Sequence, residues 1–182
     1  MKYQLLRNKV TTTDPQEELL IQVDEKNNII GSISRQEAHT TPGVFYRTVY
    51  ILVKNDKNEI LIQRRSSTKD LYPNCWDISV GGHVNFGKSY LETAVREIRE
   101  ELGLIVEPGD MKLKGEVLVH LSKSNEYFNV FEYTLKPGEK IEVNAEEIGS
   151  TGWAKIEDIK KSMADKSRQW YARPEQVVAA LY

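Results

Sequence analysis

The chain has 182 residues, of which 40% are hydrophobic, and it carries a formal net charge of −2. This length supports one domain with a sizeable core, and the near-balanced charge argues against a protein that binds a nucleic-acid backbone. The single cysteine, Cys75, cannot form an intrachain disulfide, and no apolar stretch has the length of a membrane span. We therefore expect a cytoplasmic protein that binds neither membranes nor nucleic acids.

The first half of the chain is rich in strand patterns. Residues 19–24 and 29–34 flank the turn-forming EKNN and predict a β-hairpin. A second hairpin is predicted from residues 44–54 and 59–65, whose β-branched and aromatic residues indicate a strand in the centre of a sheet. Between the hairpins we expect a short helical turn over 35–39, and after them a loop over 66–76. The polar residues 1–15 predict a weakly ordered extension.

A helix is predicted after the glycine-rich turn in GGHVNFGKSYLETAVREIREELGL, residues 81–104. Ser89 is a suitable N-cap, with Glu92 three residues later in the capping-box position, and Gly103 suits a left-handed helix C-terminus. Apolar residues repeat on one face, which can dock on a core: Leu91, Val95, Ile98 and Leu102.

The second half predicts two more strands, at 112–121 and 126–136, and another that runs through Trp153. Helices are expected at about 156–165 and 174–181, where Pro174 suits a helix start. Strands on both sides of one helix, followed by terminal helices, predict a mixed α+β layered domain over residues 16–182.

Three glutamates lie together on one side of the predicted helix. Glu97, Glu100 and Glu101 stand at positions i, i+3 and i+4, where like charges repel one another. A bound divalent cation would turn this repulsion into attraction, and ligands that are all oxygen favour Mg²⁺, with Mn²⁺ as a substitute. The alternative is an ordinary solvated acidic face.

These residues and their neighbours resemble the Nudix hydrolase signature, Gly-x5-Glu-x7-Arg-Glu-U-x-Glu-Glu-x-Gly-U, in which U is aliphatic. Eight positions of this chain fall on the pattern: Gly82, Arg96, Glu97, Ile98, Glu100, Glu101, Gly103 and Leu104. The first glutamate of the pattern is replaced by Lys88, which puts metal affinity or catalytic efficiency in question.

The resemblance implies an α/β/α sandwich around a mixed sheet, together with a set of site residues. It implies that Glu97, Glu100 and Glu101 hold Mg²⁺ with the backbone carbonyl of Gly82, and that one of the glutamates helps to deprotonate water. Arg96 would orient Glu97 through a charge-assisted hydrogen bond. An extra carboxylate, Glu147, stands where the family often supplies one from a loop.

Residues upstream of the signature resemble the branch of the family related to isopentenyl-diphosphate isomerase, over roughly residues 20–105. This likeness suggests that Arg65 and Lys69 contact a diphosphate, and that His83 contacts substrate or metal. However, Gly81 stands where the isomerase has its cysteine, and glycine has no side chain for proton transfer. Tyr46 similarly replaces a metal-binding histidine of the isomerase.

The sequence thus predicts a Mg²⁺-dependent pyrophosphohydrolase that acts on a small-molecule diphosphate, nucleoside-linked or other. A catalytically silent module that binds a nucleotide or metabolite is the alternative that Lys88 suggests. The isomerase itself is disfavoured by Gly81. The resemblance adds a homodimer as an expected assembly, while the substrate cannot be read from the motif.

Overall fold

The computed structural model describes residue 12 and residues 14–182. The nine strands are β1 (Leu19–Val23), β2 (Ile29–Ser34), β3 (Val44–Lys54), β4 (Ile60–Arg65), β5 (Trp76–Ile78), β6 (Val80–His83), β7 (Lys112–His120), β8 (Ser124–Thr134) and β9 (Ile148–Ala154). The helices are α1 (Arg35–Thr40), α2 (Tyr90–Leu102), the 3-10 turn η1 (Pro108–Asp110), α3 (Ile156–Ala164) and α4 (Ala172–Leu181). The predicted strands and helices are confirmed to within a few residues, but β5 and β6 were not predicted, and Gly81 and Gly82 lie in strand β6 rather than in a turn.

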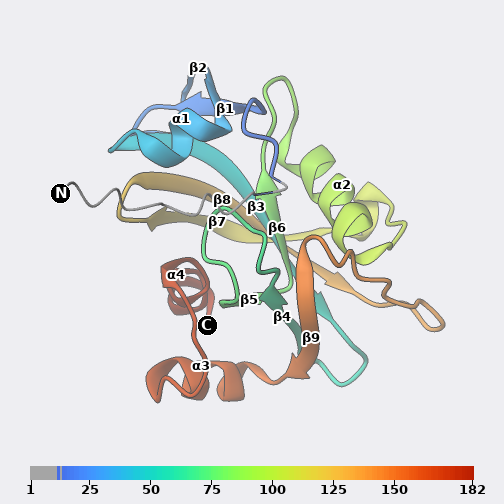
Figure 1. Ribbon diagram of the computed structural model, residues 1–182. Coiled ribbons are helices and arrows are strands. Elements are labelled where there is room, and N and C mark those ends of the chain that lie inside the picture. Colours follow the sequence, from blue (N-terminus) through green and yellow to red (C-terminus); the bar gives the residue numbers. More distant parts are fainter. Residues whose placement is uncertain (1–11, 13) are drawn as a thin grey trace.

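The strands form one mixed sheet with helices on both faces (Figure 1). In β3, Val49, Ile51 and Val53 point into one core cluster, which also contains Ala94, Ile98 and Leu102 of α2. The alternate residues Tyr50 and Leu52 point into a second cluster, with Ile159 of α3 and Val177 of α4. Burial on both faces explains why β3 is apolar almost throughout, and the α/β/α sandwich is confirmed.

The sheet opens between β3 and β4. These strands pair only at their closed end, where Lys54 lies opposite Ile60, so the second hairpin is shorter in hydrogen bonding than the sequence suggests. Beyond that point β3 pairs with β6 and with β8, the latter in parallel, whereas β4 pairs with β5 and β9. The result is a wedge-shaped gap in the middle of the sheet.

Ser79 joins the two sides of this wedge between β5 and β6. Its hydroxyl accepts from the Val53 amide and donates to the Leu61 carbonyl, at 2.9 and 2.8 Å. Its φ of +45° lies in the left-handed region, which allows the chain to cross from β4 to β3. The strand that carries Gly81 and Gly82 is therefore fixed beside the opening.

Helix α2 begins and ends as the sequence predicts. Ser89 and Glu92 form a reciprocal capping box, and Gly103 has a φ of +68° at the C-terminus. The helix packs on β3 and β6, so it lies against the strand that carries Gly81 and Gly82 (Figure 1).

Most of the predicted N-terminal extension, residues 1–11 and 13, lies outside the described residues. Within the described part of that segment, Asp14 is buried, with 6% of its surface exposed. No helix in the described part of the chain is long and apolar enough to cross a membrane.

Candidate active site

A cavity of about 320 Å³ lies at the open end of the wedge. It is lined from the N-terminal segment, α1, β3, β4, β6, α2, the loop before β5, the turn before β9, and the start of α4. All nine residues predicted for the site line it: Arg65, Lys69, Gly82, His83, Arg96, Glu97, Glu100, Glu101 and Glu147.

Glu97 is pressed against the β6 backbone at Gly82. A β-carbon built at position 82 would collide with the Glu97 carboxylate, so any residue other than glycine there would displace Glu97. Arg96 donates to Glu97 at 2.6 Å and to Glu100 at 2.8 Å, and this pair of contacts matches the orienting role predicted for it. Burial raises the pKa of Glu97 to about 8; the Arg96 charge opposes the rise, and Glu100, Glu18 and Glu147 add to it.

Glu101 is the most deeply placed carboxylate of the helix, with 6% of its surface exposed. The amide of Gln63 in β4 donates to it at 3.2 Å and also donates to the Ser79 carbonyl, which ties the carboxylate to the wedge. Burial raises the pKa of Glu101 well above its usual value, and the charges of Glu97 and Glu147 raise it further. Sequence reasoning missed Gln63 as a contact of this site.

The acidic residues at the cavity offer oxygen ligands to a divalent cation. Among the described residues, no three His, Cys, Asp or Glu side chains are close enough together to hold a metal ion as they stand. Glu100 is exposed and pairs with Arg96, whereas Glu101 is buried and the Glu97 side chain is 12% exposed, and the pKa values of both are raised. Two largely buried carboxylates that repel each other, beside Glu147 and a bare glycine backbone, form an oxygen-only donor set that a hard divalent cation would stabilise. These residues therefore fit a divalent cation, provided that the Glu100 side chain rotates toward it.

The predicted phosphate-binding cations are already paired. Lys69 is buried and donates to Glu147 at 2.6 Å and to Asp14. Arg65 donates to the Leu71 carbonyl at 3.0 Å, lies 3.6 Å from Asp77, and faces the ring of Tyr171. Both cations border the cavity, so both can reach an anionic ligand after modest rearrangement.

His83, the last residue of β6, also lines the cavity. Its Nε2 is 3.3 Å from Nε2 of His39, whose Nδ1 lies 3.4 Å from Asp70. Burial and the nearby Arg35 guanidinium hold the pKa of His83 well below its usual value, so it is neutral at neutral pH. A neutral imidazole can accept a hydrogen bond from substrate or water.

Position 81 has no room for a side chain. A β-carbon there would lie 2.8 Å from the Tyr50 ring and 3.2 Å from the Val49 carbonyl. Tyr46, at the other departure from the isomerase, donates to the buried Glu126 at 2.7 Å. Gly81 and Tyr46 are thus both closely packed against buried neighbours.

Lys88 lies outside the cavity. Its side chain is 59% exposed and sits 3.6 Å from Glu92, one turn further along the same exposed face. The residue that breaks the signature therefore places its charge in solvent, away from Glu97 and Glu101.

Several residues that line the cavity come from parts of the chain that carry no recognisable functional motif. Arg173, at the start of α4, reaches the cavity and donates to Glu126 at 2.8 Å. Asp14 and Glu18 enter from the N-terminal segment, and Asp70 from the loop before β5. A lone Arg before Pro174 and an Asp-Pro step in a polar segment are common in surface turns, so no local pattern would have identified them.

Comparison with known proteins agrees with this geometry. The profile of the NUDIX domain matches residues 44–174 of the chain. The chain belongs to the Nudix family. The match contains the signature helix, the wedge and the start of α4, so it covers most of the residues around the cavity.

Curated relatives are named Nudix hydrolases. An uncharacterized Nudix hydrolase of Pseudomonas aeruginosa is 40% identical over 87 residues, which are 48% of this chain and 51% of the relative. One from Nostoc is 33% identical over 118 residues, 65% of this chain and 70% of the relative. The matched region spans about half the length of the Pseudomonas relative.

Solved structures confirm the fold. A crystal structure of a Deinococcus radiodurans protein matches with a TM-score of 0.74 and 27% identity, covering 91% of this chain and 99% of the other. A MutT protein from Methanosarcina mazei matches with a TM-score of 0.59 and 26% identity, covering 76% and 90%. The likeness to the isomerase branch stays a prediction.

Proposed function

We propose that this Nudix protein is a Mg²⁺-dependent pyrophosphohydrolase that cleaves a phosphoanhydride bond of a small-molecule diphosphate. One observation carries the proposal. Glu101 is buried and the Glu97 side chain is only 12% exposed, both carboxylates line the cavity with raised pKa values, and Glu97 packs directly against the Gly82 backbone. When both are ionised, the Glu97 and Glu101 carboxylates repel each other, which lowers the stability of the fold. A bound cation would offset this repulsion.

The residues that would hold the cation are Glu97, Glu100, Glu101 and the Gly82 carbonyl, with Glu147 beside them. When bound, Mg²⁺ withdraws charge from the phosphoryl oxygens and lowers the pKa of water; Mn²⁺ can do the same. A carboxylate of the cluster accepts a proton from the attacking water. The water oxygen forms a bond to phosphorus, and the bond from phosphorus to the bridging oxygen breaks.

The other cavity residues bind and orient the diphosphate. Arg65 and Lys69 supply donors to phosphoryl oxygens, and the neutral His83 hydrogen-bonds to substrate or to ordered water. Arg96 holds Glu97 in position through the 2.6 Å contact. All of these side chains border the same cavity, and this shared position supports the roles proposed for them.

The silent binding module is a weaker candidate. It was suggested by Lys88, whose side chain lies in solvent and outside the cavity. The two hypotheses predict different outcomes. An enzyme would hydrolyse its ligand, whereas a binding module would be thermally stabilised by the ligand without turnover.

The test is a panel of nucleoside diphosphates, dinucleoside polyphosphates, nucleotide sugars and prenyl diphosphates, each incubated with Mg²⁺ and scored for phosphate or monophosphate release. We expect at least one member to be hydrolysed, with no release when EDTA replaces Mg²⁺. Ligand-induced stabilisation with no release from any member would favour the module. Conversion of isopentenyl diphosphate to its allylic isomer would favour the isomerase.

A further inference from the structure

Asp14 is a buried carboxylate that receives an unusually complete set of donors. Its Oδ1 lies 2.8 Å from Nη2 of Arg35 and also accepts from Nζ of Lys69. Its Oδ2 accepts from the backbone amide of Asp70 at 2.8 Å and from the Thr12 hydroxyl at 3.0 Å. Two cations, one amide and one hydroxyl are the kind of donor set that binds a phosphoryl group.

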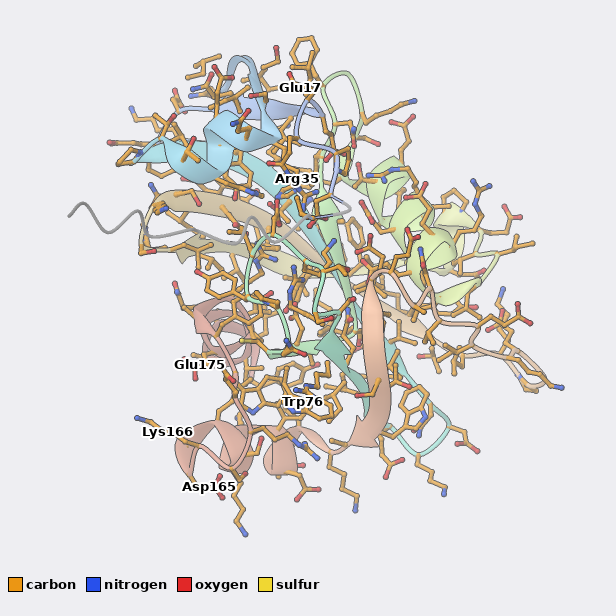
Figure 2. All side chains as sticks on the ribbon, in the orientation of Figure 1. Glu17, Arg35, Trp76, Asp165, Lys166 and Glu175 are labelled. Carbon is orange, nitrogen blue, oxygen red and sulfur yellow. The ribbon has the colours of Figure 1, made fainter. Side chains whose placement is uncertain are left out.

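The two cations keep other partners that hold them in place. Arg35 also donates to Asp70 at 3.1 and 3.3 Å, and lies 3.4 Å from Glu18. Lys69 also donates to Glu147 at 2.6 Å. In Figure 2 the Arg35 side chain lies in the interior between α1 and the sheet, whereas Glu17, from the same N-terminal segment as Asp14, lies at the outer edge. The donors would therefore stay ordered if Asp14 withdrew.

This set of donors adjoins the acidic cluster. Lys69 bridges Asp14 and Glu147, and the charge of Glu147 acts on both Glu97 and Glu101. Asp14, Arg35 and Lys69 all line the same cavity as the three glutamates. A phosphoryl group in the place of the Asp14 carboxylate would thus lie one residue away from the proposed cation site.

We propose that Arg35, Lys69 and the Asp70 amide form an anion subsite for one phosphoryl group of the substrate, and that Asp14 fills this subsite as an internal substitute until substrate displaces it. The inference rests on the proposed function for the identity of the ligand. The exchange is electrostatically balanced for an internal phosphoryl group, because a phosphorus bonded through oxygen on both sides keeps one ionised oxygen, and the Asp14 carboxylate likewise carries one negative charge. The N-terminal segment therefore competes with substrate.

A binding experiment that needs no hydrolysis tests this proposal. Methylenediphosphonate, a diphosphate analogue that cannot be hydrolysed at its bridge, is titrated with Mg²⁺ present into the full chain by calorimetry. Asp14→Ala removes the competitor, so we expect binding about tenfold tighter than in the wild type. Glu18→Gln is the matched control, because it removes one negative charge from the same cavity without vacating the subsite, and we expect a clearly smaller gain.

Lys69→Met should weaken binding and should abolish most of the gain in the Asp14→Ala background, since the freed donor is then missing. Asp14→Ala binding that is no tighter than that of Glu18→Gln would overturn the proposal, and so would the absence of binding to any variant. If no diphosphate is ever hydrolysed but Asp14→Ala still tightens binding in this pattern, the subsite stands while the enzymatic proposal fails.

Hydrogen exchange of the wild type gives a second readout that does not depend on how well a variant folds. Displacement of Asp14 predicts faster amide exchange over residues 14–18 when methylenediphosphonate is bound. A role for Asp14 as a structural anchor only predicts unchanged or slower exchange there, and that result would overturn the proposal.

Discussion

The carboxylate of Glu97 occupies the space that a β-carbon at position 82 would need. We therefore expect Gly82→Ala to displace Glu97 and to lower the hydrolysis rate on the order of 100-fold, as a misplacement of about 1 Å can do. Gly109→Ala is the control, because nothing lies within 4 Å of a β-carbon built there. Steady-state kinetics of both variants check this prediction, and near wild-type activity in Gly82→Ala would contradict it.

Lys88→Glu, which restores the glutamate of the signature, should not weaken metal binding and should leave thermal stability nearly unchanged. Lys88 is exposed and forms an ion pair with Glu92 one turn away, so Lys88→Glu removes a surface ion pair and adds a like-charge pair. We expect unchanged or tighter Mn²⁺ affinity in calorimetry, with at most a small loss of thermal stability. Lys88→Gln separates the loss of the positive charge from the gain of a negative one. Weaker metal binding in Lys88→Glu would show that Lys88 has a role of its own.

Asp77 should make stability depend on pH. Burial raises its pKa from 3.8 to about 6, against the lowering effects of Arg173 and of the hydrogen bond from Tyr171. Between these two values the folded state binds more protons than the unfolded state, so the stability contributed by this group falls as pH rises from about 4 to 6. The shift corresponds to about 3 kcal/mol at most.

Denaturant unfolding of the wild type and of Asp77→Asn at pH 4, 5, 6 and 7 measures this effect. We expect the free energy of unfolding of the wild type to fall relative to that of Asp77→Asn across the series. A difference between the two that stays constant, or grows in favour of the wild type, would show that the Asp77 pKa is not raised in the folded state.

The sequence predicted the local elements well, because each has a local cause. The capping box of Ser89 and Glu92, the left-handed Gly103 and the alternation along β3 are all formed by residues close together in the chain. The nine predicted site residues likewise border one cavity. The signature spacing accounts for Gly82, Arg96 and the three glutamates on β6 and α2, whereas Arg65, Lys69 and Glu147 lie outside the signature.

What escaped prediction depends on contacts between distant parts of the chain. The wedge arises because β3 and β4 form hydrogen bonds mainly with strands that come later in the chain, β6 and β9. The pattern of residues 44–65 alone does not indicate these partners. Asp14 meets Lys69 and Arg35 only after the loop before β5 folds over the N-terminal segment. A polar segment with a proline, such as residues 1–15, predicts weak order, so the burial of Asp14 could not be inferred from the sequence.

The proposed chemistry depends on the buried carboxylates at the wedge. The measurement is the rate of phosphoanhydride hydrolysis as a function of Mg²⁺ concentration for the wild type, Glu101→Gln and Glu92→Gln, using whichever diphosphate the wild type hydrolyses. Glu92→Gln removes the same charge from an exposed position of the same helix and keeps a residue that can complete the capping box. We predict a fall of at least about 100-fold in Glu101→Gln and little change in Glu92→Gln. Hydrolysis by Glu101→Gln at the wild-type rate, or by the wild type without any divalent cation, would contradict the proposed function.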